Sequence, residues 1–212
     1  MSSPVSSSRI TSPSVASSTF RADALCGALA GLLIALPALV ETFTGETSAT
    51  SVALALAPAF ALPLLTGLQL RQSTATGRFG DLARTVNLIG LGLFGGAAFA
   101  SNLVLFYFAD DVVEETLTGP TLPVFLGSAA VFAVGCALFG AALIRARVFP
   151  RTPSWGYAVV LPLFAFLTGL PDSVLTSALH IVVGVILLWL SVALWRLARS
   201  VDHTVIPNRV SA

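Results

Sequence analysis

The basic residues of this chain are segregated along the sequence. All eleven are arginines, and they form four groups separated by long apolar stretches: Arg9 and Arg21; Arg71, Arg78 and Arg84; Arg145, Arg147 and Arg151; Arg196, Arg199 and Arg209. Seven of the ten acidic residues occupy the alternate positions between these groups: Glu41, Glu46, Asp110, Asp111, Glu114, Glu115 and Asp172. Because Lys and Arg in short loops stay on the cytoplasmic side, this alternation predicts six membrane crossings with both termini in the cytoplasm.

Composition agrees with a membrane location. Hydrophobic residues make up 56% of the chain and charged residues only 10%, with a mean hydropathy of +0.91, whereas soluble domains carry roughly 25% charged residues. The apolar runs are long enough to cross about 30 Å of hydrocarbon. We therefore expect an all-α integral membrane bundle of six transmembrane helices in the plasma membrane. The expected spans are about 22–40, 51–70, 86–108, 122–144, 155–170 and 173–195.

The regions outside the spans are short. Residues 1–20 are rich in Ser, which predicts a disordered cytoplasmic tail. Residues 21–197 form the predicted transmembrane domain, and residues 198–212 a short cytoplasmic tail. The first apolar run is longer than a usual signal-peptide core and no A-x-A site follows it, so we expect a retained helix. The absence of Lys, with abundant Ala, Leu, Val and Gly, favours a GC-rich prokaryotic genome.

Small residues at four-residue spacing predict where helices pack. Gly27 and Gly31 form a GxxxG pair in the first span, and Gly92 and Gly96 form another in the third. Such pairs allow the backbones of two membrane helices to approach closely. We expect the third span to be the central packing helix.

Few polar residues lie within the spans. His180 is expected about seven residues into the sixth span, Asn102 at a similar depth in the third, and Thr176 on the helix face of His180, with Asp172 near the entrance. One interpretation is a small outward-facing site in which His180 binds substrate or a proton. The other, which we favour from the sequence, is an ordinary hydrogen bond between helices.

Several classes of site have no support in the sequence. There is no P-loop, dinucleotide fingerprint, GxSG serine, HExxH helix or paired intramembrane aspartate, and no second histidine at the depth of His180 for a haem. Cys26 and Cys136 are far apart and resemble small apolar residues. The acidic run at 110–115 could bind Ca²⁺ but is more typical of a solvated loop. We expect no enzyme activity, cofactor, metal or nucleic acid.

Two functions are left open. The first is a non-enzymatic membrane component or accessory subunit, bound to a membrane-protein partner or to further copies of itself within the bilayer. The second is a small permease with a polar site near His180 and Asn102. Leu62-Pro63-Leu64 and Leu161-Pro162-Leu163 occur in the second and fifth spans, as in an inverted repeat of a transporter. The matching stretches at 41–45 and 115–119 indicate a different, two-span repeat.

Overall fold

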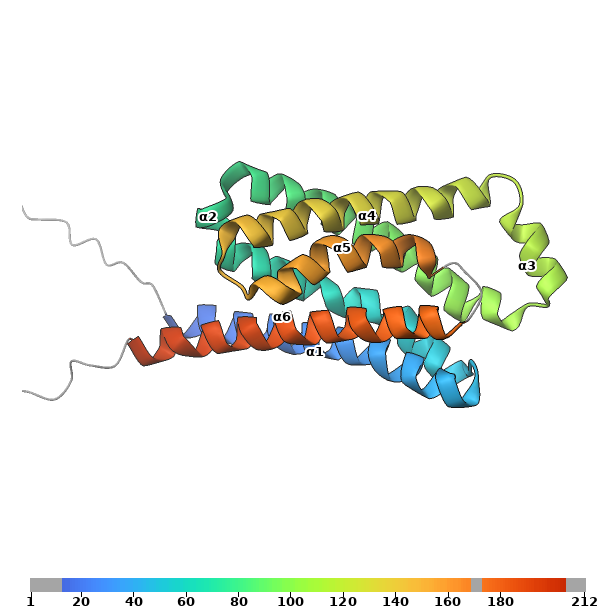
Figure 1. Cartoon of the computed structure of the whole chain (residues 1–212), viewed down its shortest axis with the longest axis horizontal. Helices are drawn as coiled ribbons and strands as arrows, with labels where there is room; N and C mark the ends of the chain where they lie inside the picture. Colours follow the sequence, from blue (N-terminus) through green and yellow to red (C-terminus); the bar gives the residue numbers. More distant parts are fainter. Residues whose placement is uncertain (1–12, 169–172, 205–212) are drawn as a thin grey trace, which may run out of the picture.

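The computed structural model describes residues 13–168 and 173–204, with side chains described for 18–168 and 173–200. Every regular element in these ranges is helical (Figure 1). The elements are α1 (Pro13–Thr44), α2 (Ser48–Leu103), the short 3₁₀ helix η1 (Leu105–Tyr107), α3 (Asp110–Leu117), α4 (Thr121–Ala146), α5 (Arg151–Leu167) and α6 (Val174–Thr204). The all-α class is confirmed.

Helix α2 is a helical hairpin that reverses at Gly77. This residue has φ 52° and ψ −144° inside an otherwise helical run of 56 residues, a conformation that only glycine adopts readily. Figure 1 shows the first half of α2 running toward the reversal and the second half returning beside it. Pro58 lies in the contact between the halves, since a Cβ added to Gly95 would lie 2.9 Å from its Cβ. Counting both halves, the described residues contain six long helical segments, which agrees with the predicted number.

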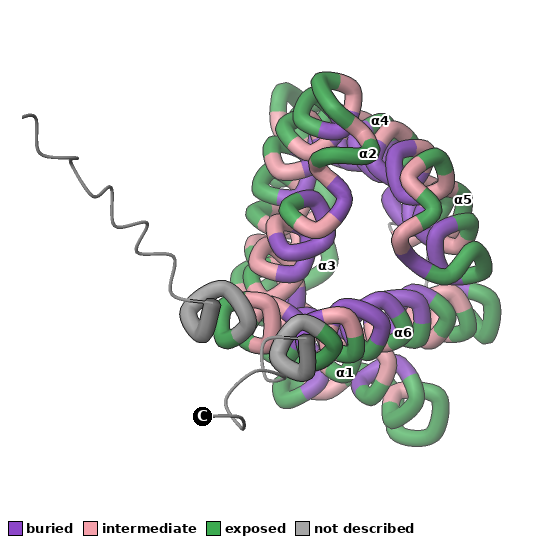
Figure 2. Tube along the Cα trace, turned by 90° about the vertical axis from the view of Figure 1, so that its left-hand side faces the viewer, coloured by how far each residue is buried: buried purple, intermediate pink, exposed green. Residues whose placement is uncertain are grey.

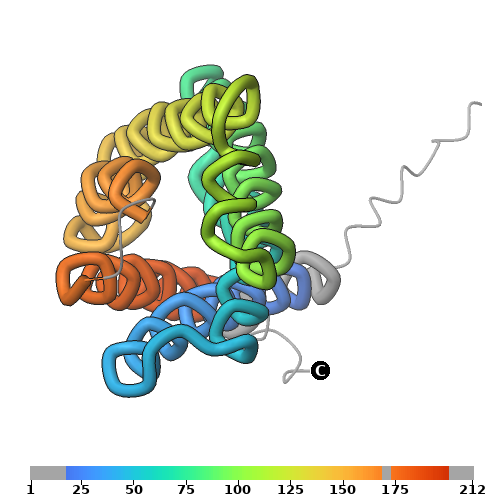
Figure 3. Tube along the Cα trace, turned by 90° about the vertical axis from the view of Figure 1, so that its right-hand side faces the viewer, coloured from blue at the N-terminus to red at the C-terminus, as the bar shows by residue number. Residues whose placement is uncertain are grey.

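The six segments form a ring in the order of the sequence. α1 packs on α2, α2 on α4, α4 on α5 and α5 on α6, while the extensive contact between α6 and α1 closes the ring. Figures 2 and 3, which view the molecule along the helices from opposite ends, show this closed arrangement. Buried residues, drawn purple, lie on much of the inner side of the ring, and most exposed residues lie on its outer side (Figure 2).

Small residues bring neighbouring helices of the ring together. A Cβ added to Gly31 of α1 would lie 2.6 Å from the carbonyl oxygen of Gly184 in α6, and one added to Gly27 would lie 2.5 Å from Ser191 Oγ. Gly90 and Gly135 hold α2 against α4 in the same way. By contrast, Cβ atoms at Gly92 and Gly96 would have no neighbour within 4 Å. The expected packing surface of the third span therefore lies at Gly90 and Gly95, on a different face of α2.

Four of the described helices are long and apolar enough to cross a membrane: Ser18–Thr44, Ser48–Tyr107, Thr121–Ala146 and Val174–Ser200. The second contains 60 residues, which is about 90 Å of helix and far more than one crossing requires. Its reversal at Gly77 divides that length into two segments. α5 has 17 residues and is the shortest of the six.

The helices extend beyond the predicted spans at the arginine-rich end. α1 begins at Pro13 and so includes residues 13–20, which the sequence assigned to the tail. Residues 71–85, expected as a polar loop, continue the two halves of α2 on either side of Gly77. Helix α6 continues past residue 195 to Thr204. Helical backbone can extend into water because its hydrogen bonds are satisfied internally, so the limits of the apolar runs do not set the helix ends.

The acidic segment is a helix. Asp110 and Asp111 stand in the first turn of α3, where negative charge is favoured by the helix dipole. Val113 and Leu117, four residues apart, are its partly buried side chains, and the carboxylates of Glu114 and Glu115 are exposed. This one-sided pattern explains why a run of carboxylates forms an amphipathic helix across the end of the bundle (Figure 1).

Candidate functional site

The ring encloses a cavity of about 500 Å³ that reaches the acidic end of the bundle. Glu41, Glu46, Leu117 and Leu122 line it at that end, and Leu68, Tyr157 and Leu187 line it deep in the bundle. Most of the wall is aliphatic or aromatic, with contributions from α1, both halves of α2, α4, α5 and α6. Its volume falls in the range of about 300–1,000 Å³ that is usual for small-molecule sites.

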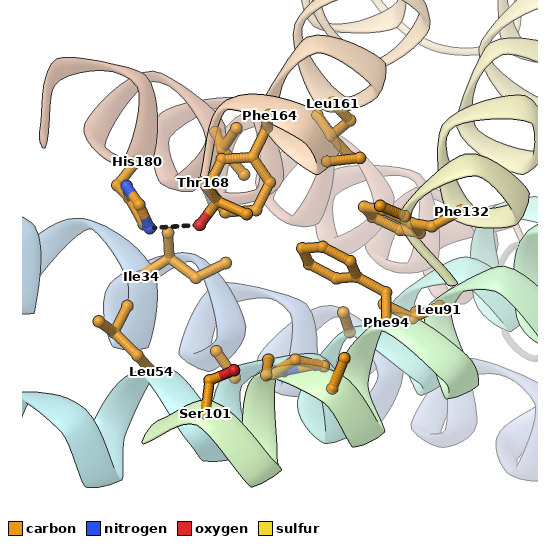
Figure 4. A pocket seen from close by; sticks show the side chains of 18 of the residues that line it. Ile34, Leu54, Leu91, Phe94, Ser101, Phe132, Leu161, Phe164, Thr168 and His180 are labelled. Carbon is orange, nitrogen blue, oxygen red and sulfur yellow. Dashed lines mark hydrogen bonds between the residues drawn. The ribbon is translucent and has the colours of Figure 1, made fainter. Parts of the chain in front are cut away.

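Aromatic rings form part of the wall. Phe94 of α2 stacks on Phe132 of α4 with ring centroids 4.6 Å apart, and Phe164 of α5 meets Phe94 edge-on at 6.0 Å. Figure 4 shows these three side chains around the cavity. The rings therefore join three helices around one apolar space.

His180 lies on the cavity wall, held between α5 and its own helix. Its Nδ1 is 2.8 Å from the carbonyl oxygen of Thr176, which can only accept, so Nδ1 carries a proton. Its Nε2 is 3.5 Å from Thr168 Oγ1 at the end of α5 (Figure 4). Phe164 packs edge-on against the imidazole with centroids 4.8 Å apart. These contacts fix the ring beside the cavity.

The other predicted site residues are distributed as follows. Thr176 is buried, lines the cavity and exchanges hydrogen bonds with Ser173 at the start of α6. Asn102 lines the same cavity, but its Nδ2 donates to the carbonyl oxygen of Ala98 in its own helix. Asp172 lies outside the described residues. The structure thus brings His180, Thr176 and Asn102 to one cavity, and the hydrogen bonds described for Asn102 and His180 go to separate partners.

A buried polar cluster at the deep end was not predicted. Asn87 of α2 donates through Nδ2 to the hydroxyl of Tyr157 in α5 at 2.7 Å, and Cys136 of α4 donates to Asn87 Oδ1 at 3.4 Å. All three are buried. Asn87 and Tyr157 each come two residues or fewer after the start of a predicted span at the arginine-rich end, so their common depth was a usable signal.

A second polar cluster lies beyond the deep end, near the reversal of α2. Gln72 Nε2 donates to Gln69 Oε1 and Gln69 Nε2 to Asp81 Oδ1, both at 3.1 Å. Gln69 and Gln72 are almost fully buried. The bonds from Gln69 to Asp81 connect the two halves of α2 next to Gly77. The spacing of Gln69, Gln72 and Thr76 places them on one helix face, which is the signal that sequence reasoning missed.

The remaining candidate chemistry is sparse. Among the described side chains, those of residues 18–168 and 173–200, no three His, Cys, Asp or Glu residues come together in a way that could hold a metal ion. Cys26 is half-buried, Cys136 is buried, and neither forms a disulfide.

No protein-family model, curated protein or solved structure matches this chain. The apolar helices have the length and composition typical of a membrane protein, and they surround a cavity of the size of a small-molecule site.

Proposed function

We propose that this chain is a small, non-enzymatic permease that binds a lipophilic small molecule in the central cavity and passes it across the bilayer. The cavity itself supports the proposal: it has the volume of a ligand site and a largely apolar wall, and six helical segments contribute to it. A helix bundle built only for support would gain stability by filling such a space, because packed interiors leave few voids larger than a water molecule.

The two ends of the cavity differ, as a carrier in one of its two states requires. At the acidic end the lining includes the exposed Glu46 and the half-buried Thr168. At the other end Leu68 and Tyr157 close the space, and the buried glutamines of α2 lie beyond them. With arginines retained in the cytoplasm, this conformation faces outward.

Binding can be tested with a pair of substitutions two residues apart on α2. Ala61 lines the cavity, and Ala59 is exposed on the outer side of the same helix. In nanodiscs, the neutral fluorophore N-phenyl-1-naphthylamine is expected to bind saturably to the wild type and to Ala59→Trp, and not to Ala61→Trp, whose indole fills the space. Equal saturable binding by all three proteins would rule out the cavity as the binding site.

Translocation needs a separate test, because a carrier must open to each side in turn. In a chain with Cys26→Ala and Cys136→Ala, Ala61→Cys should react with the impermeant thiol reagent MTSET in right-side-out and in inside-out vesicles. Reaction from the acidic side alone would identify a static binding protein and contradict the permease.

An accessory subunit is the second candidate, and one observation favours it. Gly92 and Gly96 form a small-residue surface on α2 that packs against nothing within the described chain, and such surfaces serve contacts between membrane helices. Gly92→Leu with Gly96→Leu should then abolish co-purification of a partner while leaving fluorophore binding intact. Loss of neither property would argue against the accessory role.

A further inference from the structure

Carboxylates carry the charge in the lining of the cavity. Glu41 of α1 and Glu46 of the following loop are the carboxylates that line it, and Glu41 Oε1 is fully buried from solvent. Glu46 accepts a hydrogen bond from the buried Ser51 at 2.9 Å, which fixes its carboxylate at the rim. No arginine is among the described lining residues. A ligand in this cavity therefore meets negative charge at its entrance.

The sequence provides no lysine or arginine to balance that charge at the acidic end. No Lys or Arg occurs between Arg21 and Arg71, between Arg84 and Arg145, or between Arg151 and Arg196. Asp110, Asp111, Glu114 and Glu115 of α3 lie at the same end but are exposed and do not line the cavity, so salt screens their charge from it. Charges lining a cleft with low-dielectric walls focus the field and raise the local concentration of ions of opposite sign.

The wall deeper in the cavity suits a positive charge with apolar substituents. Phe94, Phe132 and Phe164 surround the space from three helices, and ring faces attract cations through the aromatic quadrupole. An anion would enter the same space without a lysine or arginine side chain to compensate for its desolvation, which is strongly unfavourable.

We propose that the molecule bound in the cavity is a lipophilic organic monocation, such as a quaternary ammonium or an aryl-substituted phosphonium ion. Its charge is attracted by Glu41 and Glu46, and its hydrocarbon or aryl groups occupy the apolar and aromatic wall. The inference rests on the proposed function, because it names the class of substrate for the same cavity.

Two probes of matched size and opposite charge test it directly: tetraphenylphosphonium and tetraphenylborate. Equilibrium dialysis of the detergent-solubilised protein measures each, with Ala61→Trp as the blank for binding to micelles. We expect saturable binding of tetraphenylphosphonium alone. Glu41→Gln and Glu46→Gln should each weaken it by about tenfold, the loss of one attractive charge in a partly buried site. Asp111→Asn, on α3 and outside the cavity lining, should leave the dissociation constant within about twofold.

The outcomes separate the two proposals. If tetraphenylborate binds as well as the cation, or if both glutamate variants bind the cation like the wild type, the charge inference is overturned. In that case saturable binding of the neutral fluorophore still supports the proposed function. If the neutral fluorophore also fails to distinguish Ala61→Trp from the wild type, both proposals fall together.

Discussion

Single hydrogen bonds between helices hold the deep end of the cavity. Tyr157 accepts from Asn87 at 2.7 Å with both side chains buried. A buried amide that loses its acceptor costs free energy because no water replaces the bond. In membrane proteins such bonds contribute only about 0.6–2 kcal/mol each, since the alternative state also finds partners.

Removing one hydroxyl measures this contribution. Tyr157→Phe should destabilise the protein by about 1 kcal/mol, seen as a lower midpoint of thermal unfolding in detergent. Tyr107, which is 59% exposed, is the control, and Tyr107→Phe should leave the midpoint unchanged. Equal midpoints for the two variants would show that the Asn87–Tyr157 bond does not stabilise the fold.

The polar residues show how far sequence reasoning reaches at this scale. His180, Asn102 and Thr176 attract attention because each interrupts an apolar run, and all three line the cavity. Asn87 and Gln69 also accept or donate in buried clusters, yet they lie near predicted span ends, where polar residues are ordinary. A polar residue at the end of an apolar run is buried only where the helix continues past that run. Hydropathy does not reveal how far a helix continues, so it cannot separate a buried polar residue from a solvated one at these positions.

At the scale of helices, close packing depends on which face of each helix points inward. A Cβ atom added to Gly31 would contact the backbone of Gly184 on α6, whereas one added to Gly92 would have no neighbour within 4 Å. Both glycines belong to a GxxxG pair in the sequence. Such a pair marks a surface of small residues but does not indicate which way that surface faces. Only the placement of neighbouring helices separates them.

Replacing each of these two glycines by alanine should therefore change the free energy of unfolding differently. Gly31→Ala should destabilise the protein by about 1–3 kcal/mol, because its methyl group overpacks the contact of α1 with α6. Gly92→Ala should be neutral or stabilising by up to about 1 kcal/mol, because alanine favours the helix and the site is open. Thermal unfolding in detergent compares them. A larger loss at Gly92 than at Gly31 would contradict the described packing.

At the scale of the whole molecule, the distribution of charged residues and the arrangement of the helices distinguish the same two ends of the bundle. The start of α1, the reversal of α2, the connection from α4 to α5 and the end of α6 lie together at one end, and α3 lies at the other (Figure 1). Arg21 and Arg199 each lie within 6 Å of the Trp195 ring at the first end. The described arginines of the four groups therefore share an end of the bundle, while Arg9 and Arg209 lie outside the described residues.

This arrangement predicts an orientation in the membrane that labelling can test. With both native cysteines replaced by alanine, Asp111→Cys should react with an impermeant maleimide added to intact cells, because α3 is expected outside. Arg78→Cys, beside the reversal of α2, should react only after the membrane is permeabilised. The reverse pattern would place the arginines outside and invert the proposed direction of the cavity.

The sequence predicts which segments lie at each end of the bundle and how many long helical segments there are, because arginine groups and apolar runs are local signals. It does not foretell the cavity. The cavity depends on how far apart the six helical segments pack. No single lining residue, Ala61 or Leu187 for example, belongs to a sequence pattern that would reveal it.

The closure of the ring by α6 against α1 has a consequence for how the protein is made. Each earlier helix emerges from the ribosome next to its eventual neighbour, so most contacts can form as the chain inserts. The surface around Gly31, however, has its partners in α6, which is synthesised after the other described helices. Until α6 is made, that surface of α1 lacks its partner and the cavity lacks a wall. A nascent chain halted before residue 174 should therefore be unable to hold a ligand, and the final docking step completes fold and site together.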